Sequence, residues 1–349
     1  MCIVLATTAH PDYALIVLDN RDEFILRPTS RPHWWSSTHQ DILSSRDLQR
    51  VEQGTWLGIT KTGNFAVLTN YRETDTQDEE HPVQGEKSRG GMVTAWLTAL
   101  NEETTESFVE RMVNGGGVKG VGGFSLLCGK LRPRKDLNDL EPLAIISNRA
   151  GDASQVPCIA GKRGEYYGLS NTCYDDPKVW PKVERGKELL QTHIQTKADN
   201  ESQEDLITSM FQILDNDTLP PQEGQNFEAY IYHLRESIFI PAIGQAVPPQ
   251  AIPLADEIAA AHADSDCSMK IARAPLMDGE RPDPLLMTGV YGTQRQTILL
   301  VTWDGHVKYI ERSLWDGNGN AIMRGAGDVT FEFDIDGWNG HEVRGMGGA

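Results

Sequence analysis

The chain opens with two apolar segments, CIVLA at residues 2–6 and YALIVLD at residues 13–19, which are separated by TTAHPD at residues 7–12. Short apolar runs on either side of a segment rich in Thr, Pro and Asp are typical of two strands joined by a turn. We therefore predict that the chain begins with an antiparallel β-hairpin.

This hairpin determines which residues lie beside the N-terminus. If it is centred near residues 10–11, antiparallel pairing puts Cys2 opposite Asp19 or Asn20. The polar run NRDE at residues 20–23 then lies next to the first residues of the chain. A thiol, a guanidinium and a carboxylate are therefore expected close together at one end of the sheet.

The rest of the chain mixes short strands with amphipathic helices. Strands are predicted at residues 56–60, 65–70, 124–128, 143–147, 166–170, 297–303 and 307–310, and helices at 91–100, 105–113, 179–196 and 203–214. Asp-Gly at residues 304–305 is a strong hairpin turn between the last two strands. Strands at both ends of the chain with helices between them favour a layered α/β protein with largely antiparallel sheets.

The 349 residues are predicted to form a single domain, 1–349, because no linker clearly separates two parts. Three segments have the composition of surface insertions. Residues 72–87 are acidic and polar, residues 131–142 are charged around a proline, and residues 242–284 are rich in Pro and Ala. A loop as long as the third is either functional or disordered.

Composition excludes several classes of protein. A net charge of −18 argues against a nucleic-acid partner and against docking on anionic membranes through basic residues. No apolar run approaches the roughly 20 residues that a membrane helix requires. The N-terminus lacks the basic region of a secretory signal, so we expect a cytoplasmic protein.

The cysteines and histidines give no sign of a metal. The five cysteines are scattered and odd in number, without a CxxC pair, and the nine histidines include no HExxH motif. This pattern fits a reducing compartment and neither a disulfide framework nor a zinc site. We predict no metal and no cofactor.

Cys2 is the residue with the most reactive chemistry. If Met1 is removed, Cys2 carries both a thiol and a free α-amine, whose pKa near 7.7–8.0 makes it a usable base. Asp22 would orient that amine, and Arg21 would favour a thiolate or an anionic substrate. The alternative is an ordinary buried cysteine, and from the residues alone both interpretations remain open.

Other polar and aromatic side chains are candidates for the same site. Asn70 ends one predicted strand and Asn171 directly follows another, and at such a place a carboxamide can donate to a developing oxyanion or simply start a turn. A pocket for a flat or oily ligand with an acidic group could be lined by Trp34, Trp35, Trp56 and Arg149. Most such residues in proteins are instead core residues or solvated surface residues.

Taken in order, the short motifs of this chain resemble the transport and Golgi organisation 2 family. They are NRDE at 20–23 with RP at 27–28, GTWLG at 54–58, LTNY at 68–71, SRG at 88–90, GFSL at 123–126, NR at 148–149, GLSN at 168–171, YGT at 291–293, and DGHV at 304–307 with ER at 311–312. One tetrapeptide would be weak support, but nine motifs in the expected order are strong. The resemblance runs from residue 1 to about residue 313, apart from the insertions.

The resemblance implies a fold and a set of roles. The family is similar to the N-terminal-nucleophile hydrolases, so we expect a four-layer αββα sandwich. Their cysteine branch, which includes penicillin V acylases and bile-salt amidases, uses an exposed N-terminal cysteine, an Asp after the second strand, and asparagines at the oxyanion. By position, Cys2, Asp22, Asn70 and Asn171 match these roles.

Two positions depart from that pattern. Where the amidases have an arginine just before Asn-x-Asp, this chain has Asp19, and Arg21 is displaced. Where relatives have an arginine directly after Tyr-Gly-Thr, this chain has Gln294, and Arg295 follows one residue later. A step of one residue turns a side chain to the other face of a strand. Either a β-bulge restores Arg295, or its contact with an anion is lost.

Two functions follow as hypotheses. By family resemblance, the first is a role in secretion and Golgi organisation through handling of a hydrophobic anionic ligand, namely an acyl-CoA, another lipid or haem, bound by Arg21, Arg149 and the tryptophans. The resemblance also associates such proteins with Golgi and mitochondria. The second is a cysteine amidohydrolase that cleaves a C–N amide bond with Cys2 as nucleophile. Fold similarity alone does not establish hydrolysis.

Overall fold

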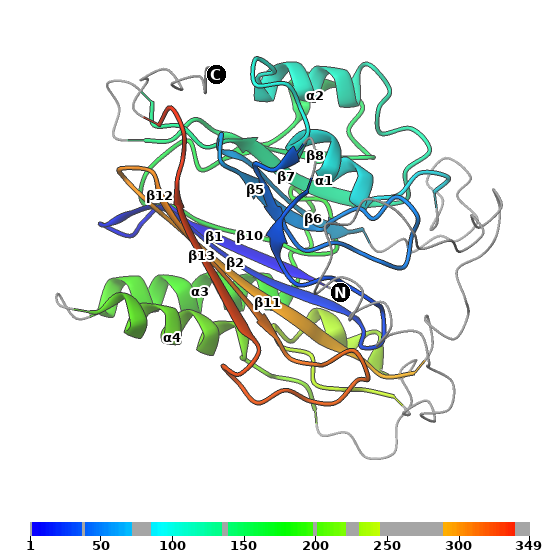
Figure 1. Cartoon of the computed structure of the whole chain (residues 1–349), viewed down its shortest axis with the longest axis vertical. Helices are drawn as coiled ribbons and strands as arrows, with labels where there is room; N and C mark the ends of the chain where they lie inside the picture. The colour runs from blue at the N-terminus through cyan, green and yellow to red at the C-terminus, as the bar shows by residue number, and fades with distance from the viewer. Residues whose placement is uncertain are drawn as a thin grey trace, which may run out of the picture.

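The computed structural model describes residues 2–36, 39–71, 85–134, 139–197, 201–220, 230–244 and 289–338. These residues form two β-sheets that pack face to face, with one pair of helices on the outer face of each sheet (Figure 1). The predicted four-layer αββα sandwich of largely antiparallel sheets is confirmed.

In the first sheet, the chain's N-terminal strand is second from one edge. Its six strands lie in the order β10-β1-β2-β11-β12-β13, and every neighbouring pair is antiparallel. Their bounds are β1 Ile3–Thr7, β2 Tyr13–Phe24, β10 Tyr166–Leu169, β11 Tyr291–Thr302, β12 His306–Ser313 and β13 Asp328–Asp334. Strands from the two ends of the chain are thus hydrogen-bonded neighbours.

The second sheet is a seven-stranded antiparallel meander in chain order, from β3 to β9. Its strands are β3 His33–Trp34, β4 Ile42–Ser44, β5 Leu57–Thr60, β6 Asn64–Asn70, β7 Phe124–Lys130, β8 Leu143–Ser147 and β9 Cys158–Ile159. Short connections favour antiparallel neighbours, but β6 and β7 also pair although residues 71–123 lie between them.

Helices cover both outer faces. Helices α1 Gly90–Leu97 and α2 Thr105–Val113 pack on the second sheet, and α3 Pro181–Thr196 and α4 Gln203–Leu214 pack on the first. Two short 3-10 helices, η2 Ala153–Gln155 and η3 His233–Arg235, complete the regular structure. Within the described residues, no helix combines the length and hydrophobicity needed to cross a membrane.

Three apolar layers hold the sandwich together. One lies between the sheets and includes Val17, Phe65 and Leu299, and the other two lie between each sheet and its helices. The alternation of the strands explains this division, since successive side chains point to opposite faces. On β2, Val17 faces the other sheet, while Ile16 and Leu18 face helices α3 and α4.

The N-terminal hairpin forms as predicted, with its register displaced. Ile3 pairs with Asn20, so continuing the ladder by one residue puts Cys2 opposite Arg21 and not opposite Asp19 or Asn20. The centre of the hairpin therefore lies between Pro11 and Asp12. The predicted insertions at 72–87, 131–142 and 242–284 overlap gaps at 72–84, 135–138 and 245–288, which lie outside the described residues. In the described part of the second, Leu131 and Leu140 are buried core residues and not surface residues.

Candidate functional site

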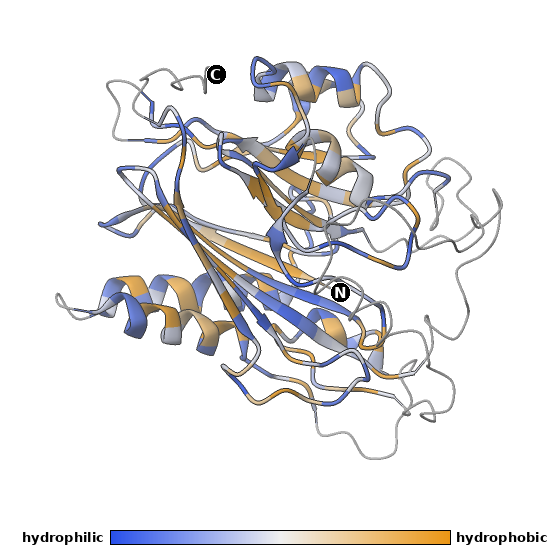
Figure 2. Cartoon of the chain, viewed as in Figure 1, coloured by the Kyte–Doolittle hydropathy of each residue, from blue (hydrophilic) through white to orange (hydrophobic). Residues whose placement is uncertain are grey.

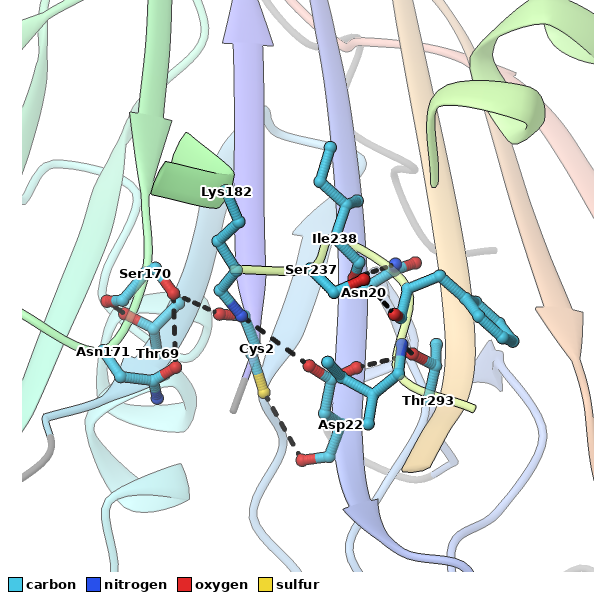
Figure 3. A network of polar contacts seen from close by, with 12 residues as sticks. Cys2, Asn20, Asp22, Thr69, Ser170, Asn171, Lys182, Ser237, Ile238 and Thr293 are labelled. Atoms are coloured by element: carbon cyan, nitrogen blue, oxygen red, sulfur yellow. Dashed lines mark hydrogen bonds and ion pairs between the residues drawn. The ribbon is translucent and has the colours of Figure 1, made fainter. Parts of the chain in front are cut away.

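Cys2 lies at the end of β1, beside β2 and β10. The Ser170 hydroxyl donates to the backbone oxygen of Cys2 at 2.7 Å, and the Cys2 Sγ lies 3.8 Å from the backbone oxygen of Asp22 (Figure 3). Burial raises the pKa of the Cys2 thiol above its ordinary value. The thiol is thus held between two strand ends, and is mainly protonated at neutral pH.

Asn20 and Asp22 of the NRDE run face helices α3 and α4. The Asn20 amide donates to the backbone oxygens of Leu214 and Ile238, at 2.8 and 2.9 Å. Leu214 is the last residue of α4, and its carbonyl has no hydrogen-bond donor within the helix, so the Asn20 amide supplies that donor. This contact gives Asn20 a structural role.

The Asp22 carboxylate is held by two partners on the same face. Its Oδ1 accepts a hydrogen bond from the Thr293 hydroxyl at 2.8 Å, and its Oδ2 lies 3.9 Å from the Lys182 Nζ (Figure 3). Burial raises the pKa of Asp22, whereas nearby positive charge, including Lys182, opposes that rise. The carboxylate is positioned next to the backbone of Cys2.

Lys182 is a residue of this site that the sequence analysis missed. Its side chain is fully buried near the start of α3, and desolvation lowers its pKa. A cation at a helix N-terminus is unfavourable, because the helix dipole is positive there. The close packing of α3 on β1 holds Lys182 in this position. The two elements lie so near each other that a Cβ atom added at Gly186 of α3 would be 2.7 Å from the Leu5 side chain of β1.

Asn70 and Asn171 meet across the two sheets. The Asn171 amide donates to the backbone oxygen of Asn70, and one residue earlier the Thr69 hydroxyl donates to the backbone oxygen of Ser170 at 2.6 Å. Because Ser170 also contacts Cys2, the ends of β1, β6 and β10 are joined by direct hydrogen bonds. The structure therefore brings together all four residues predicted for catalysis.

Arg21 points between the sheets, in contrast to Asn20 and Asp22. Its guanidinium lies over the ring of Trp56, 4.4 Å from the centroid, and donates to the Gln294 side chain. Trp56 precedes β5 in the facing sheet, so this cation–π contact joins the two sheets near Cys2. The predicted ligand-binding residues Arg21 and Trp56 thus lie together.

A β-bulge brings Arg295 to the same face. The register between β2 and β11 shifts between Thr293 and Arg295, so that Thr293 pairs with Asp22 and Arg295 pairs with Arg21. Gln294 is the extra residue, and its amide donates to two backbone carbonyls. Of the two alternatives drawn from the sequence, the compensating bulge is confirmed.

Three other predicted ligand-binding residues lie elsewhere or at the margin. Trp35 donates to Ser44 and packs in the layer under α1 and α2, and Trp34 packs edge-on against Phe333 of β13 at the far edge of the first sheet. The structure does not bring these two tryptophans to Cys2. Arg149 lies over the ring of Tyr71, the residue that follows Asn70.

Two family motifs meet through their glycines. A Cβ added at Gly54 of GTWLG would lie 2.8 Å from the backbone of Gly90 in SRG. Only glycine permits so close an approach of two backbones. This packing places Arg89 near Cys2 and Glu23, and burial lowers the pKa of Arg89.

The comparisons with solved structures give a distant similarity. Penicillin V acylase from Agrobacterium tumefaciens is 10% identical, with 96% of this chain and 86% of that chain covered and a TM-score of 0.42. At that score the similarity carries no weight, and the fold assignment rests on the layers and strand order described above.

The sequence comparisons give higher identities than the comparison with the solved structure. The transport and Golgi organization protein 2 homolog of Homo sapiens is 29% identical over 314 residues, which are 87% of this chain and 88% of that protein. An uncharacterized protein of Saccharomyces cerevisiae is 26% identical over 338 residues, 91% of this chain and 93% of that protein. The family model described as transport and Golgi organisation 2 matches residues 1–316. The chain therefore belongs to the transport and Golgi organisation 2 family.

Proposed function

We propose that this protein binds a small hydrophobic anionic ligand at the Cys2 end of the sandwich, and that it serves in transport and Golgi organisation, for which its relatives are named. The observation that carries the proposal is the pairing of two buried guanidiniums, Arg21 and Arg295, beside the Trp56 ring. The ligand classes that we propose are acyl-CoA, other lipids and haem.

The physical argument concerns desolvation. Burying a guanidinium costs free energy unless a counter-charge and hydrogen bonds compensate. Arg21 and Arg295 are direct partners on neighbouring strands, so each also repels the other. An anionic group bound here offsets both costs, and the Trp56 face offers apolar contact.

Binding experiments test this proposal. Palmitate and haem are titrated into the full chain, and we expect Arg21→Met to weaken binding about tenfold, as loss of a charge-assisted hydrogen bond does. Arg111→Met is the matched control, because Arg111 lies on α2 with about half of its side chain exposed. Equal affinities for the two variants, or no binding to the wild type, would contradict the proposal.

A second function has its own supporting observation, the meeting of Cys2, Asp22, Asn70 and Asn171 at the ends of separate strands. In an amidohydrolase, the Cys2 Sγ would attack the amide carbonyl while its proton passes to the freed α-amine of Cys2, held by Asp22. The oxyanion would receive N–H donors from the asparagines. Expulsion of the protonated amine would leave a thioester, which water cleaves to an acid and the free thiol.

Intact mass separates the two functions. Loss of Met1, followed by an acyl adduct on Cys2 during incubation with an amide panel, would support the hydrolase. Replacement of Cys2 by Ala should abolish the adduct, yet leave ligand binding within about twofold of the wild type if the protein only carries its ligand. A retained Met1 or an acetylated Cys2 would remove the proposed base and exclude this mechanism.

A further inference from the structure

The interior face of the first sheet carries residues in rows that cross β2, β11 and β12. The pairing gives the rows Leu15–Val301–Val307, Val17–Leu299–Tyr309, Asp19–Thr297–Glu311 and Arg21–Arg295–Ser313. The first two rows are apolar apart from one phenol. The last two are polar, and we call their six residues the interior polar cluster. Continued onto β1, the last row ends at Cys2.

All six residues of the cluster are buried, and the two arginines are only 5% and 7% exposed. Arg295 donates to Thr29 at 2.9 Å and lies 3.9 Å from the Glu311 carboxylate, which is beyond hydrogen-bond distance. Glu311 is instead held by the Ser45 hydroxyl at 2.7 Å, from the facing sheet. The guanidinium of Arg295 is thus only loosely compensated.

Several buried polar atoms of this region have no hydrogen-bond partner within the part of the chain that the structure describes. They are Asp19 Oδ2, Trp56 Nε1, Arg295 Nε and Nη1, Glu311 Oε1 and Ser313 Oγ. Unpaired buried groups are rare, because each costs about 1–3 kcal/mol. So many in one cluster indicate that it receives a polar group from outside the chain.

The charges of the interior polar cluster restrict the chemical class of the polar group that it can receive. Burial raises the pKa of Asp19 well above its ordinary value, and Asp22 adds to the rise. Burial also raises the pKa of Glu311, so the two carboxyls offset the positive charge of Arg21 and Arg295 only in part. A planar carboxylate accepts in-plane N–H donors such as Arg295 Nε and Nη1 and buries one negative charge, whereas a phosphate ester dianion would bury two.

We propose that the interior polar cluster binds a carboxylate, and that this carboxylate is the acidic group of the ligand. This inference rests on the proposed function and narrows it. Arg295 and Trp56 donate to the carboxylate oxygens, and Arg21, stacked on Trp56, supplies the second positive charge. A carboxylate is also what remains after the cleavage of an amide, so the site suits either function.

Titration calorimetry of the full chain with octanoate, octanamide and octyl phosphate tests the charge and the site separately. We expect octanoate to bind the wild type about tenfold more tightly than the neutral amide and more tightly than the phosphate ester. Arg295→Met should remove this preference, Arg295→Lys should restore part of it, and Arg111→Met should leave it unchanged. If Arg295→Met does not fold, Trp56→Phe retains the ring but lacks the N–H donor, and it should weaken octanoate binding several-fold.

The outcomes distinguish failure of this inference from failure of the proposed function. Equal binding of octanoate and octanamide overturns the inference alone, and so does tighter binding of octyl phosphate. An unchanged preference in Arg295→Met, or in Trp56→Phe where Arg295→Met does not fold, also overturns the inference alone. No binding of any of the three compounds up to millimolar concentration overturns both.

Discussion

The two halves of the inter-sheet interior are built on the same strands and differ in chemistry. At one end, β2, β11 and β12 present Leu15, Leu299 and Val307 to the facing sheet, and at the other they present the interior polar cluster. Figure 2 shows this change as strands that turn from orange to blue toward the N-terminus. The backbone pairing is continuous across the change, except at the bulge beside Arg295.

The comparison teaches which half stabilises the fold. Apolar side chains gain free energy when they leave water, about 25 cal/mol per Å². Buried charges and unpaired polar atoms cost free energy instead. Of these two halves, it is therefore the apolar one that stabilises the sandwich, together with the apolar layers under the helices, and the polar half is retained for another reason. Perturbed polar groups beside a cleft or a reactive thiol are typical of functional sites.

The largest effect is expected in the apolar half. Leu299 is fully buried between the sheets, so Leu299→Ala should lower the free energy of unfolding by about 3 kcal/mol, through lost burial and the cavity that remains. Urea denaturation measures this change. Leu100→Ala is the control, because Leu100 is 75% exposed, and it should be close to neutral. A loss below about 1 kcal/mol at Leu299 would contradict the assignment of stability to this half.

In the polar half, the change in unfolding free energy on removal of a hydroxyl should depend on whether that hydroxyl is hydrogen-bonded. Ser45→Ala removes the donor to Glu311 and should cost about 1–2 kcal/mol, because a buried carboxylate loses its hydrogen bond. Ser313→Ala removes a hydroxyl that has no partner among the described residues, and should leave stability unchanged or raise it by up to about 1 kcal/mol. Urea denaturation of both variants measures the contrast. Equal losses would show that the Ser313 hydroxyl is paired.

Much of the fold could be predicted because its signals are local. Helices α2 and α4 have the predicted bounds, and β8 does too. The last strand, β13, was missed, although Val329, Phe331 and Phe333 alternate with polar residues along it. All seven residues of this edge strand are partly or fully exposed, so it lacks the continuous apolar run by which the buried strands were predicted.

The site was predictable where a polar residue or the reactive cysteine lies at or beside a strand terminus, as for Cys2, Asn70 and Asn171. It was not predictable where burial depends on packing from a distant segment. Lys182 lies on a helix about 160 residues from Asp22, and no periodicity marks a buried lysine. Likewise Trp35 and Trp56 look alike in sequence, yet one faces the helices and the other faces Arg21.

The smallest effect concerns pH, and it tests whether the polar half destabilises the folded chain at neutral pH. Burial raises the pKa of Glu311, opposed by Arg295 and Ser45, with Arg31 and Tyr309 also facing it. A carboxyl whose pKa is raised by folding binds more protons in the native state. Its contribution to stability is therefore greatest below the unfolded pKa of about 4.3 and is lost as pH rises through the raised folded pKa.

Glu311→Gln should remove this dependence, because the amide does not titrate and still accepts from Ser45. The difference in unfolding free energy, wild type minus Glu311→Gln, should therefore fall as pH rises from about 4.5 to 8. The subtraction removes the contribution of the other acidic groups, because most of them titrate alike in both proteins. Asp19 is an exception, since its pKa responds to the charge of Glu311. A difference that rises with pH would mean that Arg295 holds Glu311 ionised. Glu311 would then offset one guanidinium in full, which would leave the cluster less positive charge for an anionic ligand.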